Sequence, residues 1–77
     1  MDLVVEVKVH SSFIHSPIAG FKGKKFIAFG CKGEDLVKML GIDKDYCFLM
    51  INGRLGHMDY LLKDGDKVEI FPVIIGG

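Results

Sequence analysis

The last third of the chain decides the fold. It reads Leu62-Lys63-Asp64-Gly65-Asp66-Lys67-Val68-Glu69-Ile70-Phe71-Pro72-Val73-Ile74-Ile75-Gly76-Gly77. The Asp-Gly-Asp segment is typical of a tight turn, and residues 67–71 alternate as a strand with Val68 and Ile70 on one face. Pro72 restricts the backbone where this strand ends. Chain ends are usually polar and frayed, whereas this one stays apolar up to two glycines, so we expect it to carry the function.

The two glycines predict a tail that enters a site on another protein. Glycine has no Cβ, so Gly76 and Gly77 can approach a partner closely, and the only ionisable group at the tip is the α-carboxylate of Gly77. Extended, residues 72–77 span at most about 17 Å, which is enough to reach a buried site. The alternative is a frayed end or a cloning remnant. The predicted tail is residues 73–77, namely Val73, Ile74, Ile75, Gly76 and Gly77, and it leaves the sheet at Pro72.

Composition limits the classes of function. The 77 residues suffice for a single domain, 1–77, and their formal net charge is zero. Nucleic-acid and membrane-surface proteins favour a basic excess, so we expect neither partner. No apolar run is long enough for a membrane span, and the first residues lack the basic region of a signal peptide. We expect a reduced cytoplasmic protein that is a monomer when free.

The cysteines and histidines suggest no chemistry of their own. Cys31 and Cys47 could form a disulfide, but nothing indicates an oxidising compartment. A buried small hydrophobic residue is the other interpretation of Cys47. The three histidines, His10, His15 and His57, are too scattered for a metal site.

Periodicity and turn residues predict the remaining elements. The first strand carries Val5, Val7 and Val9 on one side and charged residues on the other. Asn52-Gly53 is a strong hairpin signal, because both turn positions need positive φ, and Gly41 suits a helix C-terminus. The expected order is strand 3–9, a loop 10–23 with apolar residues and one helical turn, strand 24–29, helix 33–40, strand 47–51, strand 54–57, a buried turn 60–62, turn 63–66 and strand 67–71.

One helix cannot cover both faces of such a sheet, so one face must stay open. If Val68 and Ile70 face the helix, Phe71 lies on the open face. By the same alternation Phe48 and Met50 face outward, since the other set of the third strand is more uniformly core-like; that set is Cys47, Leu49 and Ile51. We expect Phe71, Phe48 and Met50 to form a partner-docking surface. The alternative is that they are scattered surface hydrophobic residues.

The order of elements, the Ile51-Asn52-Gly53 segment and the stretch from Leu62 to Pro72 before Gly76-Gly77 are similar to the ThiS and MoaD sulfur-carrier proteins. The resemblance is specific over the last third of the chain. It implies an α+β fold of the ubiquitin-like β-grasp type, a mixed ββαβββ sheet with one short helix packed on one face. The long connection between the first two strands resembles molybdopterin-type carriers, which hold extra helical structure there. Val73, where the family often has a second proline, and the bulky Ile75 depart from the pattern.

The resemblance also implies a mechanism. The Gly77 carboxylate would be adenylated by a ubiquitin-activating-like enzyme of the MoeB or ThiF type, using ATP and magnesium, and converted to a thiocarboxylate by a sulfur donor. The sulfur would pass to an acceptor, either the large subunit of a molybdopterin synthase, which we favour, or a thiazole synthase. The chain itself would be no enzyme and would bind no cofactor. The alternatives are a protein modifier conjugated through Gly77 and a ubiquitin-like interaction domain whose tail is never activated.

Overall fold

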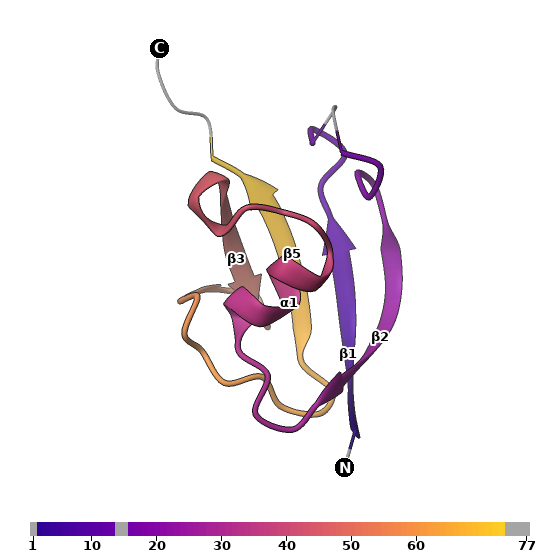
Figure 1. The fold of residues 1–77 in the computed structure, drawn as a ribbon, viewed down its shortest axis with the longest axis vertical. Helices are drawn as coiled ribbons and strands as arrows, with labels where there is room; N and C mark the ends of the chain where they lie inside the picture. Colours follow the sequence, from indigo (N-terminus) through magenta and orange to yellow (C-terminus); the bar gives the residue numbers. More distant parts are fainter. Residues whose placement is uncertain (1, 14–15, 74–77) are drawn as a thin grey trace.

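A computed structural model describes residues 2–13 and 16–73 of the chain. Five strands form one sheet, a seven-residue helix crosses one face of it, and a single 3-10 turn precedes the third strand (Figure 1). No helix in this described part is long and apolar enough to span a membrane. In chain order the elements are β1 (Asp2–Val9), β2 (Lys22–Ala28), α1 (Gly33–Met39), η1 (Lys44–Tyr46), β3 (Cys47–Ile51), β4 (Arg54–Gly56) and β5 (Lys67–Pro72).

The sheet is mixed, with spatial order β2-β1-β5-β3-β4, and the first and last strands run parallel at its centre. The turn before β5 holds this parallel pair together. The Asp64 carboxylate accepts the Val4 N–H at 2.8 Å, and the Gly65 N–H donates to the Val4 carbonyl at 2.8 Å. Gly65 has a φ of 86°, a left-handed conformation that favours glycine. The Asp-Gly-Asp segment therefore fixes how β1 and β5 align.

The core lies between the sheet and α1. Alternate residues of the two central strands are buried against the helix, as their periodicity predicts. Leu36 and Val37 of α1 are both fully buried. A seven-residue helix is too short to be stable alone in water, so this burial supplies most of its stability. The Asp35 carboxylate accepts the Lys32 N–H at 2.9 Å at its first turn.

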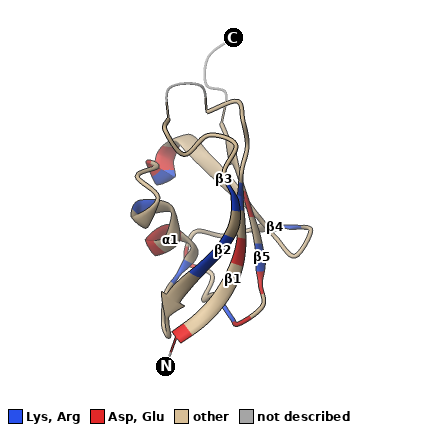
Figure 2. Cartoon of the chain, turned by 90° about the vertical axis from the view of Figure 1, so that its right-hand side faces the viewer, with Lys and Arg blue, Asp and Glu red and all other residues tan. Residues whose placement is uncertain are grey.

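The face of the sheet opposite α1, which we call the open face, is not covered by any described element. Figure 2 views the sheet from the side and shows α1 on one side only. Glu6 and Lys8 of β1, Phe48 and Met50 of β3 and Phe71 of β5 alternate with buried residues and lie on this face. The predicted orientation of β3 is therefore correct.

Several predicted boundaries need correction. The second strand is Lys22–Ala28 rather than 24–29, because Lys22 pairs with Lys8 and the pairing ends at Ala28 opposite Asp2. Gly30, with a φ of 93°, turns the chain after it. The helix ends at Met39, with Leu40 as its C-cap and Gly41 in a left-handed conformation one position later. The first, fourth and fifth strands differ from prediction by one residue each, and η1 was not predicted.

Two predicted loop features were also partly wrong. Where one helical turn was expected between β1 and β2, the described residues form a series of turns. Phe13 and Ile18 from this loop pack on the core, as expected. In the predicted buried turn 60–62, Leu62 is buried but Leu61 is 47% exposed. The Asn52-Gly53 hairpin is confirmed, with φ values of 54° and 80°.

Candidate functional site

An aromatic cluster occupies the open face at the end where β5 finishes. Phe48 and Phe71 are direct cross-strand partners, and their rings stack with centroids 5.2 Å apart and planes 14° apart. The His10 ring, which follows β1, lies 5.3 Å from the Phe71 ring. We define His10, Phe48 and Phe71 as the aromatic cluster. Phe48 is 37% exposed and His10 is exposed, so the cluster presents ring surface to solvent.

Apolar surface continues from the cluster toward β4. Met50, the third predicted docking residue, is half-buried and lies opposite Glu69 on β5 and opposite Leu55 on β4. Directly opposite residues share a face of the sheet, so Leu55 extends the same surface. Its side chain is 70% exposed. The structure thus brings the three predicted docking residues onto one face and adds His10 and Leu55, which the sequence did not indicate.

The chain leaves the sheet beside this cluster. Pro72 is the last residue of β5 and pairs with Cys47. The next residue, Val73, still belongs to the body, because its N–H donates to the Tyr46 carbonyl at 2.9 Å. In an antiparallel pair successive backbone nitrogens point alternately toward and away from the partner strand. The backbone nitrogen of Pro72 therefore points away from β3, at a place beyond the end of β1. Proline is tolerated there because no ladder donor is needed.

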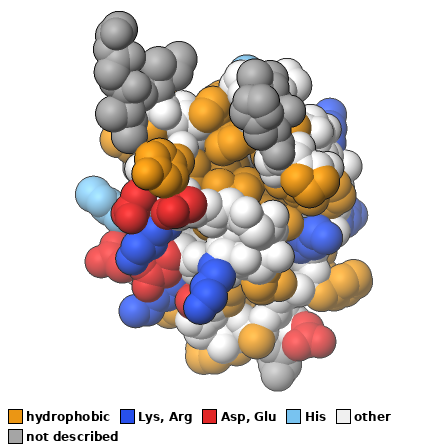
Figure 3. Space-filling view, turned by 45° about the horizontal axis from the view of Figure 1, so that its top comes forward, with side chains coloured by type: hydrophobic (Ala, Val, Ile, Leu, Met, Phe, Trp, Pro, Cys, Tyr) orange, Lys and Arg blue, Asp and Glu red, His pale blue; other side chains and the backbone are white. Residues whose placement is uncertain are grey.

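Val73, the first residue of the predicted tail, is thus hydrogen-bonded to the body of the domain. The other predicted tail residues, Ile74, Ile75, Gly76 and Gly77, lie outside the described residues. On the helix side, a shallow hollow with an apolar lining adjoins the exit point. Its apolar walls come from Phe13, Ile42, Tyr46, Pro72 and Val73. Figure 3 shows hydrophobic side chains gathered at this end of the molecule.

A buried carboxylate holds the loop that leads into β5. Asp66 is 6% exposed, and its oxygens accept hydrogen bonds from Asn52 Nδ2 at 2.8 Å, the Lys63 N–H at 2.9 Å and the Tyr60 hydroxyl at 3.1 Å. Burial alone would raise the pKa of Asp66, but these bonds and the nearby Lys63 charge together lower it. Burial, with the bond to Asp66, raises the pKa of Tyr60. The network joins the β3–β4 hairpin to the turn before β5.

Neither cysteine is placed to act as a nucleophile, and the described residues form no metal site. Cys31 and Cys47 are buried and not joined in a disulfide. Burial, and then the Asp43 charge, raises the pKa of Cys47 to about 11, and burial likewise raises that of Cys31. A thiol needs its thiolate form to react, so both are poor nucleophiles at neutral pH. In the part of the chain that the structure covers, no three His, Cys, Asp or Glu side chains are grouped to hold a metal ion.

A mixed five-stranded sheet with parallel first and last strands and one short helix on one face defines a ubiquitin-like β-grasp protein. Residues 22–77 match the model of the ThiS family, which is more than half of the chain and includes Gly76 and Gly77. The chain belongs to the ThiS family.

Solved structures share this fold. A protein described as molybdopterin converting factor subunit 1 from Pyrococcus furiosus has a TM-score of 0.72 and 24% identity, covering 94% of this chain and 99% of that one. Caldiarchaeum subterraneum ubiquitin has a TM-score of 0.66 and 15% identity, covering both chains completely. A complex of subunits 1 and 2 of the molybdopterin-converting factor from Helicobacter pylori has a TM-score of 0.55 and 24% identity, covering 97% and 100%. At these identities the likeness shows the fold alone.

Proposed function

We propose that this protein is a sulfur carrier that works through the carboxylate of Gly77. The observation that carries the proposal is the family match over residues 22–77, which runs through β5 and Pro72 to the Gly-Gly pair. The chain would supply the carboxylate and the docking surface, and its partners would supply the chemistry.

The proposed reaction has two steps on the chain. A carboxylate is a poor electrophile at neutral pH, so it must first be activated. An adenylating enzyme of the MoeB or ThiF type would join the Gly77 carboxylate to the α-phosphate of ATP, with magnesium, and release pyrophosphate. Sulfur at the sulfide level, supplied as hydrosulfide by a donor, would then attack the acyl carbon; the bond from that carbon to AMP breaks, AMP leaves, and the thioacid loses its proton. The product is a thiocarboxylate, whose sulfur is a soft nucleophile that a second enzyme can pass to a cofactor precursor.

The geometry of the exit supports this role. Val73 is held to Tyr46, so the tail that enters the partner consists of residues 74–77. Four residues span at most about 14 Å when extended. A partner must therefore dock closely, and the aromatic cluster lies beside the exit on β3 and β5. The adenylating enzyme and the acceptor would use the same surface in turn, which favours transient complexes over permanent ones.

Molybdopterin biosynthesis is the favoured pathway, with thiamine thiazole biosynthesis next. Two structural relatives are described as molybdopterin converting factor subunits, and one of them is in a complex with subunit 2. By analogy, the acceptor would be the large subunit of a molybdopterin-synthase-like complex. Production of the chain in two strains tests this choice: one lacks its own small subunit of molybdopterin synthase, and the other lacks its own sulfur carrier for thiazole synthesis. Restored molybdenum-enzyme activity is expected, whereas restored growth without thiamine alone would favour the thiazole pathway.

The activation step is tested by removing one residue. Purified chain, ATP, magnesium and the adenylating enzyme from the same cell should give pyrophosphate release and an acyl-adenylate. Deletion of Gly77 should abolish both and leave the unfolding midpoint unchanged, since it removes none of the buried residues that form the core. Substitution Ser11→Ala in an exposed turn serves as the control. Adenylation of the shortened chain at the normal rate would refute the role of Gly77.

A second candidate is a ubiquitin-like protein modifier conjugated through Gly77. The likeness to Caldiarchaeum subterraneum ubiquitin favours it, because the same activated carboxylate can be attacked by a lysine amine. Isopeptide-linked Gly-Gly remnants on other cell proteins after proteolysis would support it. An interaction domain with a tail that is never activated is the third candidate, and it predicts neither product.

A further inference from the structure

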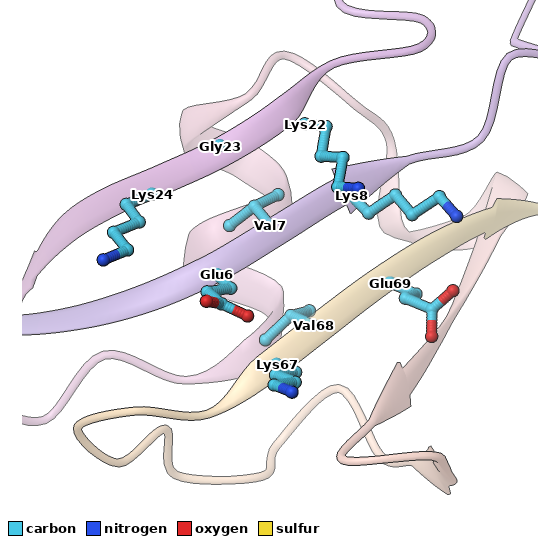
Figure 4. Close-up of a pocket in the computed structure, with 9 residues that line it drawn as sticks. All are labelled: Glu6, Val7, Lys8, Lys22, Gly23, Lys24, Lys67, Val68 and Glu69. Carbon is cyan, nitrogen blue, oxygen red and sulfur yellow. The ribbon is translucent and has the colours of Figure 1, made fainter.

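A second feature of the open face lies beside the aromatic cluster. It is a shallow hollow over β2, β1 and β5 (Figure 4). Four lysines and two glutamates line it, so its side chains carry an excess of two positive charges. Val7 and Val68 also border it, but their side chains are buried on the other face, so only their backbone contributes. We call it the lysine hollow and define it by Lys8, Lys22, Lys24, Lys67, Glu6 and Glu69.

Two of these lysines lie directly opposite each other in the sheet. Lys8 and Lys22 are direct cross-strand partners on β1 and β2. The Val9 N–H donates to the Phe21 carbonyl at 2.8 Å, so the alternation of the ladder makes Lys8–Lys22 a non-hydrogen-bonded pair, the kind with closer side chains. Figure 4 shows Lys22 extending from β2 toward Lys8. Like charges directly opposite one another destabilise a sheet.

The two glutamates offset only half of the positive charge of the four lysines. Glu6 is the partner of both Lys24 and Lys67, and Glu69 is the partner of Lys8. Yet among the residues that the structure describes, the one ion pair within 4.0 Å is Lys44–Glu34, on the other side of the molecule. An added anion could therefore contact the ammonium groups of the hollow, and it would relieve the Lys8–Lys22 repulsion.

Protection of an edge strand explains only part of this arrangement. Lysines on an exposed edge prevent pairing with other chains, which suits Lys22 and Lys24 on β2. Lys8 and Lys67 lie on the interior strands β1 and β5, where no edge needs protection. The hollow also joins the aromatic cluster, because Lys8 and Glu69 line a small depression that includes His10 and Phe71.

We propose that the lysine hollow binds a carboxylate-bearing segment of the partner protein that docks on the aromatic cluster. The proposal rests on the proposed function in one respect, namely that the partner is the enzyme that handles the tail. A protein occupant is favoured because two glutamates within the hollow and aromatic side chains beside it suit a mixed polar and apolar surface. Complementary charge of this kind mainly speeds association and selects the partner.

The first test needs no enzyme. The full chain, labelled with ¹⁵N, is titrated with hexaglutamate and with hexaglutamine at low salt. Hexaglutamate should shift the amides that border the hollow, hexaglutamine should not, and Lys22→Glu should weaken the hexaglutamate effect roughly threefold or more. Lys38→Glu, the same charge change on the exposed side of α1, should leave it unchanged. Equal weakening by both variants would overturn the proposal, as would tighter binding of a thymidine hexanucleotide at the same residues.

The second test uses the adenylating enzyme from the same cell as the probe. Lys8→Glu and Lys22→Glu should each lower its association rate constant roughly fivefold at low salt, and the difference should fade as salt rises. Lys38→Glu should associate like the wild type. An association rate that is the same for all four proteins would overturn the proposal. Failure of the enzyme to adenylate the wild type refutes the proposed function instead, and the peptide titration then still decides the inference.

Discussion

The rings of Phe48 and Phe71 stack 5.2 Å apart across β3 and β5, on the face of the sheet that α1 leaves open. Aromatic side chains contribute strongly to the stability of protein cores and of interfaces between proteins. Phe71 lies one residue before Pro72, the last residue of β5. A partner that binds over the two rings would therefore lie next to Pro72, where β5 ends.

Phe71→Glu tests this relationship. Phe71 is half-buried and its ring pairs with those of His10 and Phe48, so we expect the free energy of unfolding to fall by only about 1 kcal/mol. Binding to the adenylating enzyme should weaken by about 2 kcal/mol or more, roughly thirtyfold in Kd, as for a central aromatic anchor. Urea unfolding and calorimetric titration measure the two effects.

Phe29→Glu is the matched control, because Phe29 is 76% exposed in a turn after β2. It should change neither quantity appreciably. Two results would contradict the docking role of the aromatic cluster: an equal loss of binding in both variants, or a Phe71 variant that fails to fold.

The bond from the Val73 N–H to Tyr46 gives a separate prediction. Val73→Pro removes this donor, while Val73→Ala keeps it. The proline variant should therefore lose about 1 kcal/mol more unfolding free energy than the alanine variant, the usual net contribution of a hydrogen bond. Urea unfolding of both proteins measures the difference. Equal stability would show that the tail is already released at Pro72, as the sequence alone predicted.

Asp66 should contribute much more to stability than an exposed carboxylate. Asp66→Ala leaves Asn52 Nδ2, the Lys63 N–H and the Tyr60 hydroxyl without their acceptor. We expect a loss of about 2–3 kcal/mol, the cost of unsatisfied buried polar groups. Asp59→Ala, at an exposed position, should lose less than about 0.5 kcal/mol. Similar losses in the two variants would refute the structural role of the network.

The Asp66 carboxylate should also make the free energy of unfolding depend on pH in the acid range. The pKa of Asp66 is lower in the folded protein than in the unfolded chain, so its contribution is complete above the unfolded pKa, near 4. It is lost as the pH falls through the lower folded pKa. Asp66→Asn should therefore flatten the fall in unfolding free energy below about pH 4, and Asp59→Asn should not. An unchanged acid slope in Asp66→Asn would contradict the prediction.

Local patterns in the sequence predicted most of the fold. Alternation placed Val5, Val7 and Val9 in the core, and Asn52-Gly53 formed its hairpin. Contacts between residues far apart in the chain leave no periodic pattern in the sequence, so they were not predicted. His10 reaches Phe71 only because β1 and β5 run parallel, which no local periodicity encodes.

The start of β2 was missed for a related reason. Lys22 and Gly23 look like loop residues, since their place in the strand comes from pairing with Lys8 and Val7. The same holds for the Val73–Tyr46 bond, which depends on the register of β3 against β5. The lysine hollow likewise required the register of three strands, because its members are separated by up to 63 residues, from Glu6 to Glu69.

The most direct test of the central claim is the intact mass of the chain purified from its own cell under sulfur-replete growth. If Gly77 carries the sulfur, part of the protein should be heavier by the difference between one sulfur and one oxygen atom, and fragmentation should place the change on the last residue. The heavier form should disappear when the adenylating enzyme is deleted. A single unmodified mass, the same with and without that enzyme, would contradict the account.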